Sequence, residues 1–192
     1  FLYRIAQTWS RLASYRGSSK AVNSLCFLPN GKGVVAGSED RQVRLWRFNS
    51  ALETRKTRCY RLPSGIRQIV SGYDRNTVLA VLGQDEMLRL HVVDSNGIRP
   101  YSGPLSKELK ELITSQAAIA LSADQRYLAL AKRSKQIIVW DLKKGVKSSE
   151  IKIAQTPTAI AIPVSSDHMV VGTSEGELLV VNFEGVILKR SD

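Results

Sequence analysis

The chain has 192 residues, of which 43% are hydrophobic and 23% charged, a balance that fits a folded domain and excludes a disordered segment. Its formal net charge of +11 is concentrated at one end, because residues 1–64 carry 12 lysines and arginines against 3 acidic residues. The apolar runs are far shorter than the roughly 18 residues of a membrane-spanning helix, so we expect no membrane role. The basic end can steer polyanions, or it can be the solvated surface of a larger protein.

Four stretches share one pattern, in which three short apolar strands are separated by two polar turns. They are, in chain order, residues 22–48, 66–94, 117–142 and 158–183. The third strands end on bulky or branched residues spaced 41 to 47 positions apart: Trp46, Val93, Trp140 and Val181. A period of about 40–45 residues with several strands per unit is typical of β-propellers.

Two of these stretches resemble WD40 repeats. GSEDRQVRLW, residues 37–46, resembles the end of such a repeat, and IIVWDL contains a Trp-Asp pair at Trp140 and Asp141. The resemblance implies an all-β fold, a WD40-type β-propeller. We expect about four blades, which form part of a larger propeller whose other blades come from a longer polypeptide.

The resemblance also implies structural roles for residues around the second turn of each repeat. Asp40 would hold its turn by accepting hydrogen bonds from backbone N–H groups, with Ser38 two residues earlier. Trp46 would be wedged between blades, and Asp85 is a second turn aspartate. The Gly-His pair typical of the family is absent from all four repeats, so its buried Trp–Ser/Thr–His–Asp network cannot be complete.

The whole chain, 1–192, is expected to be one propeller segment. The repeats with their outer strands are predicted at residues 22–62, 66–116, 117–154 and 158–190, after residues 1–16, which end a preceding blade. Residues 100–116 form the longest connection, and their leucines recur at helical spacing after Ser106, a possible N-cap. We predict a short amphipathic helix or an insertion there, which either covers an edge or docks a partner.

The residues that usually carry chemistry are few and scattered. The histidines are His91 and His168 and the cysteines Cys26 and Cys59, with no spacing typical of zinc ligands. No nucleophile elbow, P-loop or G-x-G-x-x-G motif occurs. We therefore expect free thiols, no metal, no cofactor, no small-molecule substrate and no enzymatic activity.

Basic residues gather at two of the second turns. Equivalent turns of successive blades lie on one face of a propeller, so these residues are candidates for partner contacts, although each could also be simply solvated: Arg41, Arg44, Lys132, Arg133 and Lys135. The acidic Asp85–Glu86 turn interrupts them, which argues against a continuous nucleic-acid track. The resemblance favours an intracellular scaffold, cytoplasmic or nuclear, that binds other proteins in a larger complex. The alternative is an RNA-associated propeller that uses the basic first third.

Overall fold

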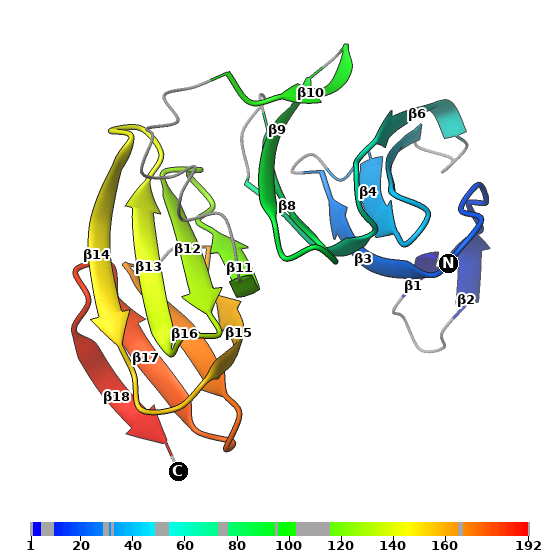
Figure 1. Ribbon diagram of the computed structural model, residues 1–192. Coiled ribbons are helices and arrows are strands. Elements are labelled where there is room, and N and C mark those ends of the chain that lie inside the picture. The colour runs from blue at the N-terminus through cyan, green and yellow to red at the C-terminus, as the bar shows by residue number, and fades with distance from the viewer. Residues whose placement is uncertain are drawn as a thin grey trace.

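The computed structural model describes residues 2–4, 10–28, 31, 33–48, 54–72, 77–94, 96–102, 116–164 and 167–191. All regular elements within these ranges are β-strands (Figure 1). They form one two-stranded and four four-stranded antiparallel sheets. The predicted all-β, four-bladed architecture is therefore confirmed.

Each four-stranded sheet is one blade, and its strands lie side by side in chain order. The short first sheet pairs β1 (Leu2–Arg4) with β2 (Ser10–Ala13). The first blade contains β3 (Val22–Phe27), β4 (Gly33–Ser38), β5 (Gln42–Phe48) and β6 (Thr54–Arg61). The second contains β7 (Ile66–Ser71), β8 (Thr77–Gly83), β9 (Leu88–Asp94) and β10 (Gly97–Pro100). The third contains β11 (Gln116–Leu121), β12 (Tyr127–Lys132), β13 (Gln136–Asp141) and β14 (Val146–Lys152). The fourth contains β15 (Pro157–Ala161), β16 (His168–Thr173), β17 (Leu178–Asn182) and β18 (Ile187–Ser191).

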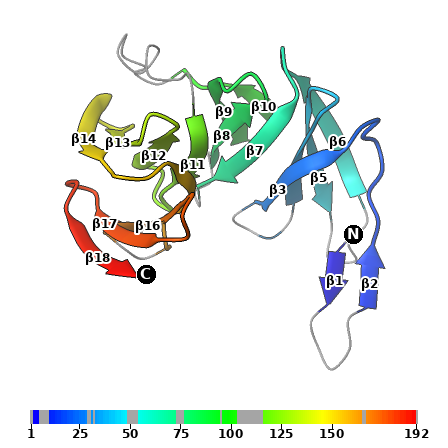
Figure 2. The ribbon, with the colours of Figure 1, turned by 60° about the horizontal axis from the view of Figure 1, so that its bottom comes forward.

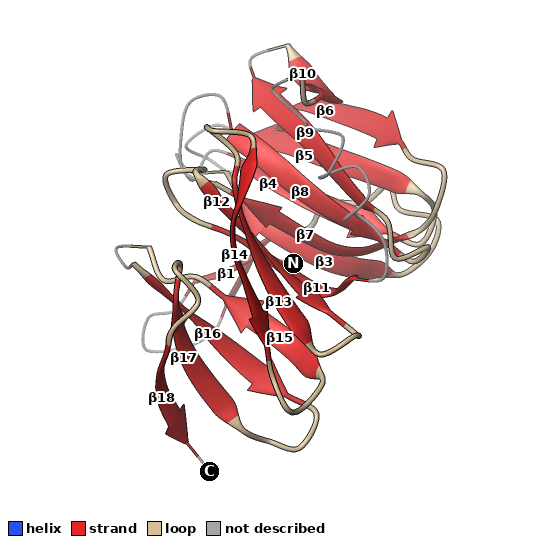
Figure 3. Cartoon of the chain, turned by 60° about the vertical axis from the view of Figure 1, so that its left-hand side comes forward, coloured by secondary structure: helices blue, strands red, loops and turns tan. Residues whose placement is uncertain are grey.

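The blades follow one another along an arc, with the first strand of each blade on the inside (Figure 2). Strand β3 contacts β7, β7 contacts β11, and β11 contacts β15. The fourth strands lie at the other edge of each sheet, and Figure 3 shows the sheets from the side. All the turns between second and third strands therefore lie at one face of the arc.

Among the described residues the buried apolar side chains form three layers, one between each pair of neighbouring blades. The third blade illustrates the pattern, because successive residues of a strand point to opposite faces. Ile137 and Val139 pack toward the fourth blade, whereas Ile138 and Trp140 pack toward the second. All four side chains are buried, so this blade is apolar on both faces, as expected for a sheet between two others.

Each first strand carries a β-bulge at its second residue. The bulged residues are Asn23, Arg67, Ala117 and Thr158. Two of them bridge to the next blade: Asn23 Nδ2 donates to the Ile66 carbonyl over 3.0 Å, and Arg67 Nη2 donates to the Ala117 carbonyl over 2.6 Å. Polar side chains thus connect neighbouring inner strands.

The long connection between the second and third blades lies largely outside the described residues. Strand β10 runs to Pro100 and β11 begins at Gln116, while residues 103–115 are not described. The helix or insertion predicted over residues 100–116 therefore stays a prediction.

Candidate functional site

The four turns between second and third strands have the same backbone geometry. They are Ser38–Arg41, Gly83–Glu86, Lys132–Lys135 and Thr173–Gly176. In each, the amide N–H of the fourth residue donates to the carbonyl of the first over 3.1–3.3 Å. The fourth residue is left-handed in every case, with φ of 68°, 59°, 61° and 90° in chain order. We call the face of the propeller formed by these turns the turn face.

A buried ion pair holds the first of these turns. Arg44 Nη2 lies 2.7 Å from Asp40 Oδ2, and the two side chains are only 6% and 5% exposed. Asp40 also accepts hydrogen bonds from the backbone N–H groups of Ser19 and Gln42, each over 3.1 Å. The hydrogen bond from Arg44 is the main reason that the pKa of Asp40 lies far below its ordinary value, despite the opposing effect of burial. Asp40 therefore fastens the preceding segment, the turn and the third strand together.

The second turn repeats this arrangement nearer the surface. Arg89 Nη2 lies 2.6 Å from Asp85 Oδ2, and Asp85 also accepts a hydrogen bond from the Met87 N–H over 3.2 Å. The Arg89 hydrogen bond, opposed by desolvation, lowers the pKa of Asp85 to about 2. The neighbouring Glu86 pairs with Arg133 of the third blade, Nε to Oε1, over 2.9 Å. The turns of successive blades are thus in direct contact.

Parts of the chain match known proteins in sequence. Residues 9–47 match the family model described as WD domain, G-beta repeat. The chain is 40% identical over 52 residues to the nuclear distribution protein PAC1 of Candida albicans, a match that spans 27% of this chain and 10% of that protein. It is 29% identical over 72 residues to PAC1 of Candida tropicalis, which spans 38% of this chain and 14% of the relative. The matches thus cover about a tenth of the length of these relatives.

The fold matches solved structures over most of the chain. The β-propeller domain of Cps50 (Swd1) from Myceliophteria thermophila superposes with a TM-score of 0.71 at 16% identity, covering 91% of this chain and 55% of that one. The chain therefore has a β-propeller fold, and its residues 9–47 match a WD40 repeat. The computationally designed Ika4 protein also matches, with a TM-score of 0.63 at 16% identity, covering 90% of this chain and 98% of that one.

The WD40 tryptophan position identifies one error in the predicted alignment of the repeats. Trp46 pairs with Val34 and Trp140 with Leu128, and each tryptophan lies five residues after the last residue of its turn, Arg41 or Lys135. The residue with this register in the second blade is His91, which pairs with Leu79, so the prediction of Val93 was wrong. The sequence pattern favoured Val93 because it is branched and apolar. The turn of the second blade ends at Glu86, and the fifth residue after it is His91.

His91 is consequently a polar residue in an apolar position. Its ring is 4% exposed and lies against Tyr60 of the first blade, with ring centroids 4.9 Å apart and planes at 63°. Both ring nitrogens are buried without a side-chain hydrogen-bond partner among the described residues. Desolvation, with a smaller contribution from the Arg89 charge, lowers the pKa of His91 from 6.5 to about 4. The imidazole is therefore neutral at pH 7.

The Trp-Asp pair of the third blade lies deep in the structure. Trp140 is fully buried, and its Nε1 has no hydrogen-bond partner within the described ranges, in keeping with the absent family histidine. Asp141 is 3% exposed and accepts hydrogen bonds from the backbone N–H groups of Lys143 and Lys144 over 3.0 and 2.9 Å. Arg126 Nε pairs with its other oxygen over 3.0 Å. Asp141 thus holds the turn after the third strand.

The five predicted contact residues do not share one environment. Arg41 and Lys135 are exposed at equivalent turn positions, and Lys132 is half-buried. Arg133 is exposed but engaged with Glu86. Arg44, predicted as a candidate partner contact, is instead buried, and its charge is balanced by Asp40. The shared i, i+4 spacing of Asp40–Arg44 and Asp85–Arg89 is the sequence signal that would have shown this.

The described part of the chain contains no group of three or more histidine, cysteine or acidic side chains that could hold a metal ion. Cys26 and Cys59 are both free thiols, and burial raises the pKa of Cys26 to about 11. No helix within the described ranges has the length and hydropathy needed to cross a membrane.

Proposed function

We propose that the chain is a non-catalytic, intracellular scaffold that binds protein partners through its turn face, within a larger protein or complex. The single observation that carries this proposal is the pair of exposed cations, Arg41 and Lys135, at equivalent points of two turns. Neither forms an ion pair within the described chain, unlike Arg44 and Arg133. Unpaired cations on a rigid surface are suited to contacts with a partner.

The charge of this face favours a partner with an acidic segment. Glu86 separates the two cationic turns, but its charge is already balanced by Arg133. An acidic partner that spans both turns would therefore meet no uncompensated negative charge between them. Lys132 lies beside Arg133 and adds a third positive charge to the same face.

The proposal is tested by reversing charge on the turn face. Arg41→Glu combined with Lys135→Glu should preserve the fold, because Glu86 already occupies the same left-handed position in the second blade. The matched control is Lys144→Glu, an exposed lysine in the turn after the third strand. We expect the double variant to retain less than about a fifth of the protein partners captured from cell extract by quantitative mass spectrometry.

Two results would contradict the proposal. The first is a loss of partners in the Lys144→Glu control that equals the loss in the double variant per unit of charge changed. It would mean that the net charge of the chain, and not the turn face, determines binding. Disappearance of the partners after nuclease treatment, with capture falling steeply as salt rises, would favour the RNA-associated alternative. Retention of partners after nuclease, together with their loss in the double variant only, is the expected outcome.

A further inference from the structure

A cavity of about 550 Å³ lies between the third and fourth blades, at the end of the strands opposite the turn face. Its walls come from the first turns of both blades and from the last turn of the fourth blade. The third blade contributes residues 122–124, Tyr127 and, from its fourth strand, Ser148, and the fourth blade contributes 163–164, Asp167 and 182–184. We call it the interblade cavity.

Three carboxylates line the interblade cavity: Asp124, Asp167 and Glu184. Their hydrogen bonds are local, to Ser122 and the Arg126 N–H, to His168, and to Asn182, respectively. Among the described residues no lysine or arginine forms an ion pair with any of them. In a chain of net charge +11, in which Asp40, Asp85 and Glu86 all pair with arginine, three carboxylates without a lysine or arginine partner thus lie at one cavity, and Asp167 contacts the neighbouring His168 Nδ1 over 3.3 Å.

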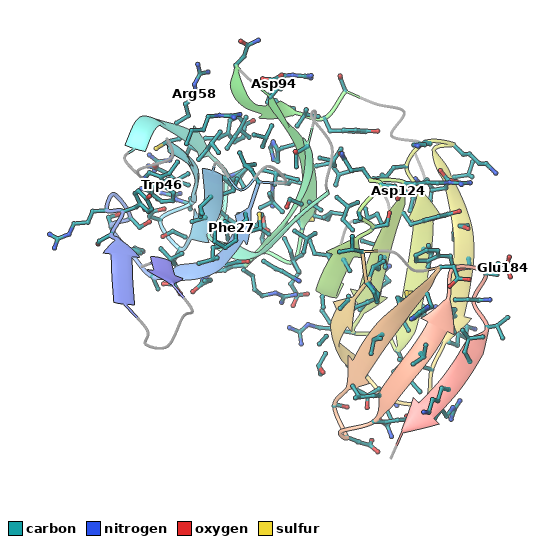
Figure 4. The ribbon with its side chains drawn as sticks, turned by 180° about the vertical axis from the view of Figure 1, so that it is seen from behind. Phe27, Trp46, Arg58, Asp94, Asp124 and Glu184 are labelled. Atoms are coloured by element: carbon teal, nitrogen blue, oxygen red, sulfur yellow. The ribbon has the colours of Figure 1, made fainter. Side chains whose placement is uncertain are left out.

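The cavity also has an apolar wall. Tyr127 and Phe183 stack across the two blades with ring centroids 4.4 Å apart and an interplanar angle of 23°. Pro163 and Val164 extend this wall, and Val164 is 67% exposed. Figure 4 labels Asp124 and Glu184 on the two blades that enclose the space. Aromatic rings and carboxylates therefore line the same cavity.

An arginine of the chain itself shows what such surroundings accommodate. The Arg126 guanidinium carbon lies 4.8 Å from the centre of the Tyr127 ring, while its Nε pairs with Asp141 over 3.0 Å. One arginine side chain thus makes a cation–π contact with an aromatic ring and an ion pair with a carboxylate at the same time. Lysine and arginine combine an apolar stem with a charged head, which is the combination of surfaces that the interblade cavity presents.

We propose that the interblade cavity binds a lysine or arginine side chain of a partner protein. The apolar stem lies along Phe183 and Val164, and the charged head reaches Asp167 and Glu184. This surface is separate from the turn face and has the opposite charge. The chain can therefore hold a basic segment on one face while an acidic segment occupies the other.

The proposal is tested with the peptide acetyl-Gly-Ser-Arg-Ser-Gly-amide and its norleucine counterpart, titrated into the full ¹⁵N-labelled chain and followed by NMR. We expect amide shifts confined to the segments that line the cavity, residues 122–127, 163–164, 167–168 and 182–185, and binding of the arginine peptide only. Asp167→Asn combined with Glu184→Gln should weaken binding at least about fivefold. Asp124 is left intact because it holds its own turn through Ser122 and the Arg126 N–H.

The matched control is Glu175→Gln, which removes an exposed carboxylate from the turn face and should leave peptide binding unchanged. Equal binding of the norleucine peptide, or shifts spread over the whole surface, would overturn the proposal. Equal weakening by Glu175→Gln would reduce it to a general charge effect. The Arg41→Glu and Lys135→Glu changes lie on the other face, so the two proposed sites can succeed or fail separately.

Discussion

His91 makes the stability of this propeller depend on pH in a range where the carboxylates contribute little. Burial lowers its pKa from 6.5 to about 4, so between these values the unfolded chain binds a proton that the folded chain does not. The free energy of unfolding therefore falls as the pH drops below 6.5 and stops falling near pH 4. Full separation of the two pKa values corresponds to about 3 kcal/mol, and we expect about 2 kcal/mol of it between pH 7 and pH 5.

The experiment compares urea unfolding of the wild-type chain and the His91→Phe variant at pH 7 and pH 5. Phenylalanine keeps an aromatic ring against Tyr60 and removes the titrating group. Asp40 and Asp85 have pKa values below their ordinary 3.8, so the stability that they provide is present above that value and is lost only at lower pH. The second histidine, His168, is the same in both proteins.

The expected result is a loss of about 2 kcal/mol in the wild type on going from pH 7 to pH 5, with a much smaller loss in His91→Phe. An equal loss in both proteins would refute the reasoning. It would mean that His91 reaches solvent or a hydrogen-bond partner readily enough to stay protonated in the folded state.

Two further predictions concern the first blade, both measured by urea unfolding at pH 7. Asp40→Asn leaves the buried Arg44 without its counter-charge and should cost about 3 kcal/mol, whereas the more exposed Asp85→Asn should cost below about 1 kcal/mol; equal costs would contradict the role of burial. Gly37→Ala should cost about 1–3 kcal/mol, because its Cβ would lie 2.3 Å from Ile66 Cγ2. The same change at the equivalent Gly172 meets only contacts of 3.7 Å or more and should be nearly neutral, so a similar loss there would refute the packing argument.

The fold was predictable because local sequence patterns determine its strands and turns. Short strands of small and β-branched residues alternate with polar turns, and this alternation recurs at a period that few architectures share. The turn at Asp40 was also predictable, since an aspartate that accepts backbone hydrogen bonds acts within a few residues of itself. The same holds for Trp140, whose bulky side chain in a β-branched strand predicts burial.

The candidate sites depended on which side chains meet across blades, and no local pattern states that. From the sequence alone Arg44 could be a solvated residue. In the structure it is buried by Asp40 and by the segment before the first blade. Glu86 and Arg133 lie 47 positions apart and pair only because successive turns lie on the same face. The sequence did not predict that His91 occupies the tryptophan position, because that position depends on the pairing of β8 with β9.

Local sequence patterns were enough to predict a propeller of repeated four-stranded blades, since backbone conformation follows from residue size, branching and turn chemistry over short distances. Which charged side chains remain free to contact a partner depends instead on the packing of the blades. This packing paired Arg44 and Arg133 with carboxylates, left Arg41 and Lys135 exposed, and formed an acidic, aromatic cavity, open to solvent, between the third and fourth blades. The physical reason is that electrostatic pairing and cavity shape depend on distances between residues far apart in the chain, which exist only once the blades have packed.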